Sequence, residues 1–246
     1  MWPRRKRLTP KAEIVHVDYA KPETVHAALN GVEAVFTATP YALLPEVEVD
    51  LVAAAKKAGV KTIVKLSGQG ADSNPTSPHG AVEVAVKNSG LAYTFLRPNF
   101  FMQNYVESAA ATIKDHGAFY EPADDGKSSY IDTRDIASVA VKALTEKAYN
   151  GKGYTLNGGE ALSRSEVAAE ISKVASKPVK YVNVDDAALR KAMAGTPQKL
   201  VDLMSVLMGY VRAGYTADTK SDLEAALGRK PITFAQFAND HASAWK

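Results

Sequence analysis

Four groups of small, polar or aromatic residues each follow an apolar run of the sequence and are the first candidates for a ligand site. They are Asp18-Tyr19, Thr37–Pro40, Ser67–Gly70 and Arg97–Phe100. In an open α/β sheet, ligands bind beyond the carboxyl ends of the strands. Strands commonly end in polar loops, so each group alone is a weak signal, but four in succession predict a site at this edge of the sheet.

Short apolar runs alternate with helical segments and would place these groups at one edge of a sheet. The pattern predicts strands over residues 13–19, 32–39, 61–67 and 91–96, and helices over residues 22–30, 45–58 and 78–89. Gly31, Gly59 and Gly90 follow the helical segments, as is typical of helix ends. Repeated βα units of this length predict an α/β fold with a doubly wound, parallel, Rossmann-type sheet.

The rest of the chain predicts a smaller, mostly helical region. Helices are expected over residues 100–115, 133–146 and most of the chain after Ser163, with short strands over 128–131, 153–156 and 179–182. The run from Ser163 to Glu166 has the form of a capping box. We expect these segments to form a helical annex on the C-terminal side of the sheet.

Composition excludes several kinds of function. The chain has 246 residues and no Cys, which excludes disulfides, thiolate metal sites and a Cys nucleophile. No apolar run approaches the ~20 residues that span a bilayer, and the five His show no HExxH spacing. We therefore expect no membrane span and no dedicated metal site.

The positive charge is concentrated at the N-terminus. Five of the 30 basic residues lie within residues 1–12, which hold no acid, so the remainder carries 25 basic against 27 acidic residues. Such a run could contact nucleic acid or anionic lipid, or it could be a solvated, disordered end. We favour the second interpretation and expect residues 1–12 to form a disordered basic tail, with neither nucleic acid nor membrane as a partner.

Several blocks of the sequence resemble one known family. They are VKLSGQGAD, HGAVEVAVKNSGLAYTFLRPNFFMQN (residues 79–104), FYEPADDGKSSYIDTRDIASVA (119–140) and ITFAQFANDHASAW (232–245). In this order they resemble the NmrA-like branch of the atypical short-chain dehydrogenases, over residues 13–246. That family includes NAD(P)H-dependent quinone and azo-dye reductases, triphenylmethane reductases, and regulators that bind the dinucleotide without turning it over. The resemblance implies one NAD(P)-binding domain over residues 13–246, with a substrate-binding annex from about 118–132 and 151–246.

The resemblance also implies roles for the residues at the strand ends. Asp18 would meet the adenine, and Thr37, Ala38, Thr39 and Pro40 would line the adenosine and phosphate side of the cofactor. Ser67 falls where short-chain dehydrogenases place an active-site hydroxyl, and Pro98, Asn99 and Phe100 would flank the nicotinamide. Phe101, Met102 and Tyr105 could line the substrate pocket, although aromatic residues at such spacing are more often plain core.

His79 and Glu83 stand where the classical relatives have a Tyr and a Lys. They are four residues apart and so share one helix face. His79 could donate a proton near neutral pH, with Glu83 orienting it or raising its pKa. The alternative is that His79 caps a helix that starts at Pro78, while Glu83 is a solvated neighbour.

The sequence departs from the family at its N-terminal end. A dinucleotide fold opens with a strand, a Gly-rich turn and a helix that holds the pyrophosphate, and this chain shows no such opening. By analogy, residues 13–19 correspond to the family's third strand, so we expect an N-terminally truncated sheet. The open explanations are a wrongly assigned start or truncated gene, a rearranged sheet in which residues 13–19 pair directly with 32–39, or completion by a partner.

Three functions remain as hypotheses. The first is an NAD(P)H-dependent, cytoplasmic oxidoreductase that transfers hydride to a quinone-like or other electrophilic aromatic small molecule, using NADP or NAD with a slight preference for NADPH. The second is a regulator that senses the dinucleotide without catalysis, and the third is a relative that has lost cofactor binding. A homodimer or a partner that completes the sheet is compatible with each of them.

Overall fold

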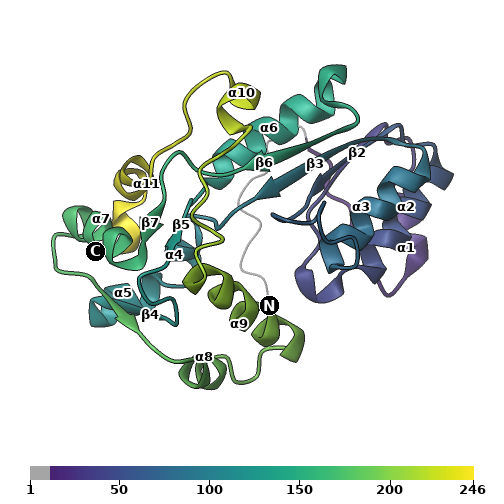
Figure 1. The fold of residues 1–246 in the computed structure, drawn as a ribbon. Coiled ribbons are helices and arrows are strands. Elements are labelled where there is room, and N and C mark those ends of the chain that lie inside the picture. Colours follow the sequence, from purple (N-terminus) through teal and green to yellow (C-terminus); the bar gives the residue numbers. More distant parts are fainter. Residues whose placement is uncertain (1–11) are drawn as a thin grey trace.

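The computed structural model describes residues 12–246, whose centre is a parallel sheet (Figure 1). The four strands lie in the order β1 (Ala34–Thr37), β2 (Thr62–Leu66), β3 (Ala92–Pro98) and β6 (Lys152–Leu156). The register aligns Thr37 with Lys65 and Lys65 with Phe95. This alignment brings the carboxyl ends of β1, β2 and β3 to one edge, as the sequence predicts.

Helices cover both faces of the sheet. One face packs against α1 (Pro22–Ala28), α2 (Glu46–Ala58) and α3 (Pro78–Ser89), and the other packs against α6 (Thr133–Thr145). Ile63 and Val64 are neighbours on β2 but belong to the cores on opposite faces. Side chains alternate along a strand, so a strand covered on both faces must be apolar throughout. The doubly wound Rossmann-type fold is therefore confirmed.

Helix α3 has the predicted bounds. The Ser77 hydroxyl accepts from the Gly80 N–H at 3.1 Å and caps its start, and Gly90 ends it with φ of +81°. A Cβ at Gly80 would lie 2.0 Å from the Asn74 carbonyl oxygen. Only glycine permits this approach, which holds the loop after β2 against the first turn of α3.

The annex is built around aromatic side chains. It comprises α4 (Asn104–Glu107), α5 (Ala110–His116), β4 (Ala118–Glu121), β5 (Lys127–Ser128), β7 (Leu162–Ser163), α7 (Arg164–Ala175), β8 (Lys180–Asn183), α8 (Asp186–Ala192), α9 (Gln198–Arg212) and α11 (Phe234–Asp240). Tyr105, Phe234 and Trp245 are buried in its core, and Trp245 Nε1 donates to the Tyr105 carbonyl oxygen at 2.8 Å. The predicted capping box at Ser163 and Glu166 is confirmed.

Two predicted boundaries need correction. The helix expected over residues 100–115 is two helices, α4 and α5, because the backbone leaves the helical hydrogen-bonding pattern around Ser108 and Ala109. Residues 152–156, expected to open the annex, form β6, which pairs with β3 in the main sheet. The short helix α10 (Leu223–Leu227) likewise packs into the core under α6.

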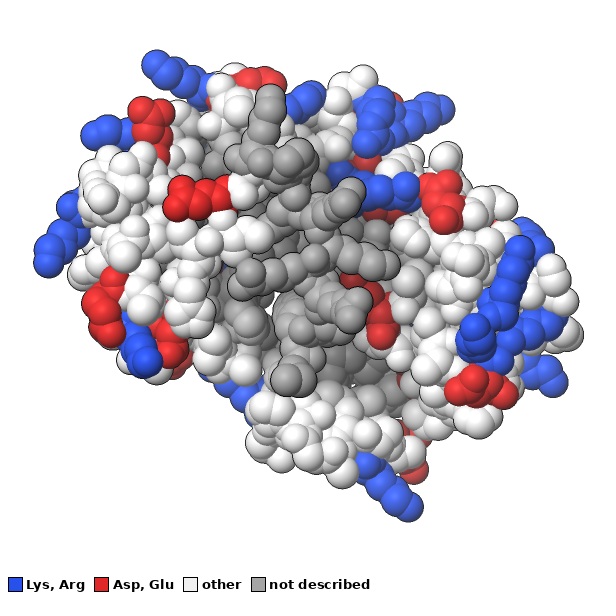
Figure 2. All heavy atoms as spheres, turned by 180° about the vertical axis from the view of Figure 1, so that it is seen from behind, with Lys and Arg blue, Asp and Glu red and all other residues white. Residues whose placement is uncertain are grey.

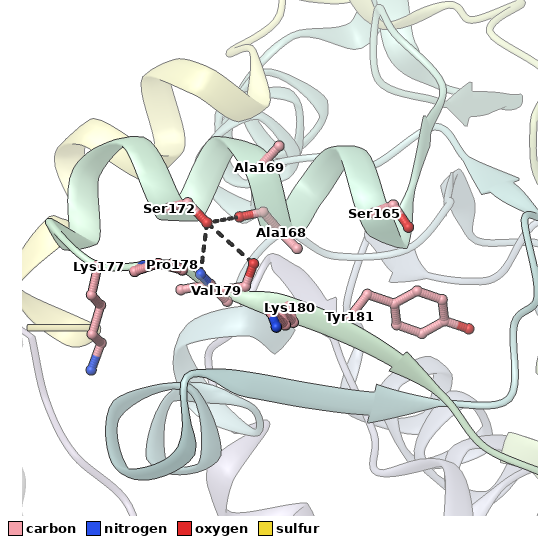
Figure 3. A pocket seen from close by; sticks show the side chains of 9 residues that line it. All are labelled: Ser165, Ala168, Ala169, Ser172, Lys177, Pro178, Val179, Lys180 and Tyr181. Atoms are coloured by element: carbon pink, nitrogen blue, oxygen red, sulfur yellow. Dashed lines mark hydrogen bonds between the residues drawn. The ribbon is translucent and has the colours of Figure 1, made fainter.

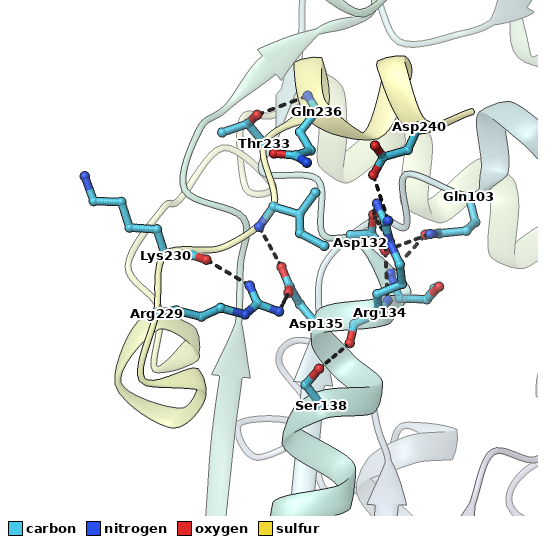
Figure 4. Close-up of polar contacts among 12 residues, drawn as sticks. Gln103, Asp132, Arg134, Asp135, Ser138, Arg229, Lys230, Thr233, Gln236 and Asp240 are labelled. Carbon is cyan, nitrogen blue, oxygen red and sulfur yellow. Dashed lines mark hydrogen bonds and ion pairs between the residues drawn. The ribbon is translucent and has the colours of Figure 1, made fainter. Parts of the chain in front are cut away.

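The start of α6 fastens the C-terminal segment to the sheet domain (Figure 4). Asp132 is fully buried and caps α6, and Arg134 bridges its carboxylate to Asp240 on α11. Asp135, also fully buried, accepts from Arg229 at 2.6 Å and from the Ile232 N–H at 2.8 Å. These charge-assisted bonds hold the last helix in place.

The strand predicted over residues 13–19 is wrong. Within the described residues this segment forms no strand, and Ile14 and Val15 are 53% and 51% exposed. A strand needs a neighbour for its backbone groups, yet β1 pairs only with β2 in the described part of the chain. The rearranged sheet, with residues 13–19 on β1, is therefore also wrong. The disordered tail was predicted for residues 1–12, of which residues 1–11 lie outside the described part.

Charged side chains of both signs are spread over the surface in Figure 2, with acidic groups lying among the basic ones. No helix of residues 12–246 is both long enough and apolar enough to cross a membrane.

Candidate functional site

The carboxyl edge of the sheet gathers buried polar residues from three successive strands. Thr37 ends β1, Ser67 follows β2 and Asn99 follows β3, with exposures of 4%, 4% and 7%. Buried polar groups need hydrogen-bond partners, and each of these residues has them. The hydrogen-bond partners of these three side chains show how the edge is held together and which of their polar atoms remain free for a ligand.

A fully buried ion pair lies beneath Thr37. Lys65 of β2 donates to Glu48 of α2 at 2.6 Å, and the Thr37 hydroxyl donates to the other oxygen of the same carboxylate at 2.6 Å. Burial lowers the pKa of Lys65, although the adjacent Glu48 carboxylate opposes the effect. The pair fixes the end of β1 to the end of β2 and orients the Thr37 hydroxyl.

A second ion pair lies under Ser67. Glu83 of α3 accepts two bonds from Arg97, at 2.9 and 2.7 Å, and one from the Ser67 hydroxyl at 2.7 Å. The hydrogen bond to Glu83 is the main reason why the pKa of Arg97 is raised. A Cβ at Gly153 would lie 2.5 Å from Arg97 Nη1, so glycine on β6 leaves room for the guanidinium.

The predicted pairing of His79 with Glu83 is wrong. The Glu83 carboxylate points to Arg97 and Ser67, and the two residues share a helix but no hydrogen bond. Burial first, and then the charge of Lys65, lower the pKa of His79 to about 4. His79 is therefore neutral at pH 7, and the expected protonated donor is corrected to a neutral imidazole.

The His79 ring lies beside the loop after β2. A Cβ at Gly68 would be 2.9 Å from His79 Cδ2, so the imidazole packs directly on the glycine. His79 Nδ1 is buried and has no hydrogen-bond partner among the described residues. The cap at the start of α3 is Ser77, so the interpretation of His79 as the cap is also wrong.

Asn99 connects the end of β3 to the segment after α9. Its side-chain NH₂ donates to Ser129 Oγ at 2.7 Å and to the Thr216 carbonyl oxygen at 2.9 Å, and its oxygen accepts from the Phe100 N–H at 2.8 Å. Both amide hydrogens are thus used within the protein. Asn99 positions this edge, Pro98 and Phe100 adjoin it in the chain, and their predicted contacts with a nicotinamide stay predictions.

The residues expected to line a substrate pocket are mostly core. Met102 and Tyr105 are 1% and 2% exposed in the aromatic core of the annex, and the Tyr105 hydroxyl lies 2.8 Å from that of Tyr130. Phe101 is partly buried against the core under α6 and bridges to Ile131. Neither Met102 nor Tyr105 can touch a substrate in this arrangement, so that expectation is corrected.

Asp18 starts the turn into α1. Its carboxylate accepts from the Ala20 N–H at 3.0 Å, and its own N–H donates to Thr24 Oγ1 at 2.9 Å. Ala38 and Pro40 are exposed and Thr39 is half-buried in the loop after β1. The adenine and adenosine contacts of these residues stay predictions.

Sequence reasoning missed the two buried ion pairs. For one of them the signal is visible in hindsight, because Lys65 interrupts the apolar run of β2 and its partner Glu48 lies between two valines at the start of α2. A charged residue inside an apolar element is rarely buried without a partner.

A surface hollow lies away from this edge, between α7 and the segment leading into β8 (Figure 3). Among its polar side chains, Ser172 shares its proton between the Ala168 and Val179 carbonyl oxygens and accepts from the Val179 N–H, while Lys177 and Tyr181 donate to the carbonyl oxygens of Lys114 and Glu121. The Ser172 hydroxyl therefore holds the segment before β8 against α7.

Comparison with known proteins assigns the family. The model of the NmrA-like family matches residues 5–238. The chain belongs to the NmrA-like family. Among curated relatives, an NAD(P)H azoreductase of Xenophilus azovorans is 41% identical over 239 residues, covering 93% of this chain and 82% of the relative. Quinone oxidoreductase 2 of Escherichia coli (strain K12) is 32% identical over 233 residues, covering 89% and 79%.

Solved structures of other reductases show the same fold. An NADPH-dependent quinone oxidoreductase from Escherichia coli, complexed with NADPH, superposes with a TM-score of 0.78 at 29% identity, covering 91% of this chain and 81% of that one. A triphenylmethane reductase from Citrobacter sp. has a TM-score of 0.78 at 24% identity, covering 94% and 83%, and supports the fold alone.

Proposed function

We propose that this protein is an NAD(P)H-dependent oxidoreductase that reduces an electrophilic aromatic small molecule, such as a quinone or an azo compound. The observation that carries the proposal is the 41% identity to an NAD(P)H azoreductase over 93% of the chain. The buried polar edge of the sheet supports it, because that edge is where an α/β sheet of this type binds its ligand.

The residues at the edge suit the uncharged parts of a dinucleotide. Ser67 donates its proton to Glu83, and a carboxylate held by Arg97 only accepts, so the Ser67 oxygen is left as an acceptor. Such an acceptor suits the carboxamide N–H of a nicotinamide. Lys65 and Arg97 are each held by a buried carboxylate and are not available to neutralise phosphates. We therefore assign Thr37–Pro40 to the adenosine side through hydroxyl and backbone contacts.

In this mechanism the bound reduced nicotinamide supplies the hydride. Pro98 and Phe100 would hold the ring, and Ser67 would fix its carboxamide. A quinone that accepts a hydride becomes a hydroquinone monoanion, which takes its proton from water. His79 is neutral at pH 7, so it would donate a hydrogen bond to the acceptor but would not transfer a proton to it.

Calorimetric titration with NADPH and then NADH tests cofactor binding, and loss of reduced-nicotinamide absorbance with a naphthoquinone and an azo dye tests turnover. Micromolar binding with turnover of either acceptor is expected. Binding without turnover would favour a dinucleotide-sensing regulator. Folded protein that binds neither cofactor would refute the proposal.

A further inference from the structure

Helix α9 has one buried face, and a half-exposed tyrosine lies outside that face. Val201, Met208 and Val211 are buried on that face, at 5%, 1% and 0% exposure. Tyr210 is 49% exposed, and Tyr215, just after the helix, is 71% exposed. The two tyrosine rings lie 6.0 Å apart at 64°, an edge-to-face arrangement. Large aromatic side chains left open to solvent are candidates for contact with a ligand.

The segment containing α9 is tied at both ends to the carboxyl edge of the sheet. Near its start, Lys199 donates to the carbonyl oxygens of Leu44 and Ala42, in the loop that follows β1. After its end, the Thr216 carbonyl oxygen accepts from Asn99, just after β3. The helix therefore spans the edge, from the end of β1 to the end of β3, and in Figure 1 it lies between the sheet domain and the rest of the annex.

Aromatic rings also line the sheet side of this span. Tyr41, in the 3₁₀ turn after β1 (Tyr41–Leu43), packs 5.8 Å from the His79 ring, which rests on Gly68. Tyr210 lies about three helical turns after Lys199, and so on the same face of α9 as the lysine that reaches the loop after β1. The pKa of Tyr41 is raised by its burial and then by Tyr210, which agrees with this placement. One pair of rings, Tyr41 and His79, thus belongs to the loops and helix beside the ends of β1 and β2, and the other, Tyr210 and Tyr215, belongs to the segment that crosses this edge.

We propose that Tyr210 of α9 and Tyr215 just after it, together with Tyr41 and His79, form an aromatic wall that stacks on the acceptor and selects planar substrates with fused or extended rings. This inference rests on the proposed function and names the substrate class of the same site. The binding free energy from stacking on an aromatic side chain grows with the ring area in contact. An extended ring system should therefore bind to the wall more tightly than a single ring does.

The test compares Tyr210→Leu with two controls. Tyr210→Phe keeps the ring, and Tyr120→Leu removes a tyrosine of similar exposure, 47%, from β4 of the annex. Steady-state kinetics with a naphthoquinone and a benzoquinone, and calorimetric Kd values for NADPH, are measured for each variant. Calorimetric titration with the naphthoquinone alone gives an acceptor Kd that does not depend on turnover.

Tyr210→Leu should raise KM and Kd for the naphthoquinone by about five- to tenfold, which corresponds to the usual strength of one aromatic pair. The KM for benzoquinone should change by less than about twofold, and the Kd for NADPH should stay the same. Tyr210→Phe and Tyr120→Leu should both resemble the parent protein.

Equal losses for both quinones, or a loss in Tyr120→Leu as large as in Tyr210→Leu, would overturn the aromatic wall. If the parent protein turns over neither quinone and does not reduce the azo dye, the proposed function fails. The naphthoquinone Kd then still decides whether Tyr210 stacks on a planar ring.

Discussion

The buried pair of Lys65 and Glu48 allows a sharp test of how this edge is held together. Both side chains are fully buried, and the pair is 2.6 Å apart. In Lys65→Met the Glu48 carboxylate keeps only the Thr37 hydroxyl as a partner and loses its counter-charge. Leaving a buried charge unpaired typically costs about 3–5 kcal/mol. We expect the free energy of unfolding to fall by that amount at pH 7.

The double variant Glu48→Leu/Lys65→Met separates this explanation from a simple loss of packing. Replacing a whole buried ion pair by apolar residues is often neutral or stabilising, so the double variant should lie within about 1 kcal/mol of the parent or above it. Lys57→Met, an exposed lysine on the same helix as Glu48, serves as control and should change stability by less than about 0.5 kcal/mol.

Urea unfolding of the parent, both single variants, the double variant and the control measures these free energies. The reasoning is refuted if Lys65→Met stays within about 1 kcal/mol of the parent, or if the double variant loses as much as the two single variants together.

Three further predictions concern the same edge. Because the pKa of His79 falls from 6.5 in the unfolded chain to about 4 in the fold, the unfolded state binds the proton more readily, so acidification from pH 6.5 to pH 4 should cost about 3 kcal/mol of stability. Urea unfolding of His79→Gln across this range should show a smaller pH dependence, and an unchanged one would contradict the assignment. Asn99→Ala removes hydrogen bonds to Ser129 and Thr216, so stability should fall by about 2–3 kcal/mol and the KM for acceptor should rise, while unchanged kinetics would remove Asn99 from the positioning of the site. Gly80→Ala places a Cβ 2.0 Å from a backbone oxygen and should lower the melting temperature by several degrees, whereas Gly159→Ala, with open space around it, should not; equal melting temperatures would refute the close packing.

Local patterns accounted for the sheet domain well. The βα alternation, the Pro at the start of α3 and the Gly after α2 and α3 are interactions between residues close in sequence, so they can be read without a fold. The strand predicted over residues 13–19 is wrong because a strand depends on contacts between segments distant in sequence. A β-branched run has strand propensity, but a strand exists only where another strand takes its hydrogen bonds, and no described residue does so here.

The location of the candidate site could likewise be predicted from the sequence, whereas the roles of its side chains could not. The location of the site, at the ends of β1, β2 and β3, follows from strand polarity alone, and Thr37, Ser67 and Asn99 all lie there. The roles of individual side chains depend on partners distant in sequence. Glu83 shares a helix face with His79, yet its carboxylate binds Arg97 of β3, because the guanidinium donates two parallel hydrogen bonds to it.

The sequence by itself determined the fold class, the family and the edge of the sheet at which a ligand would bind, because these depend on periodicity, on strand direction and on motifs of neighbouring residues. Only the tertiary structure decided which charged side chains are paired, that burial lowers the pKa of His79, and that the segment after α9 is bound to Asn99 at the edge. These properties arise from burial and from contacts between distant segments, and no local pattern encodes them.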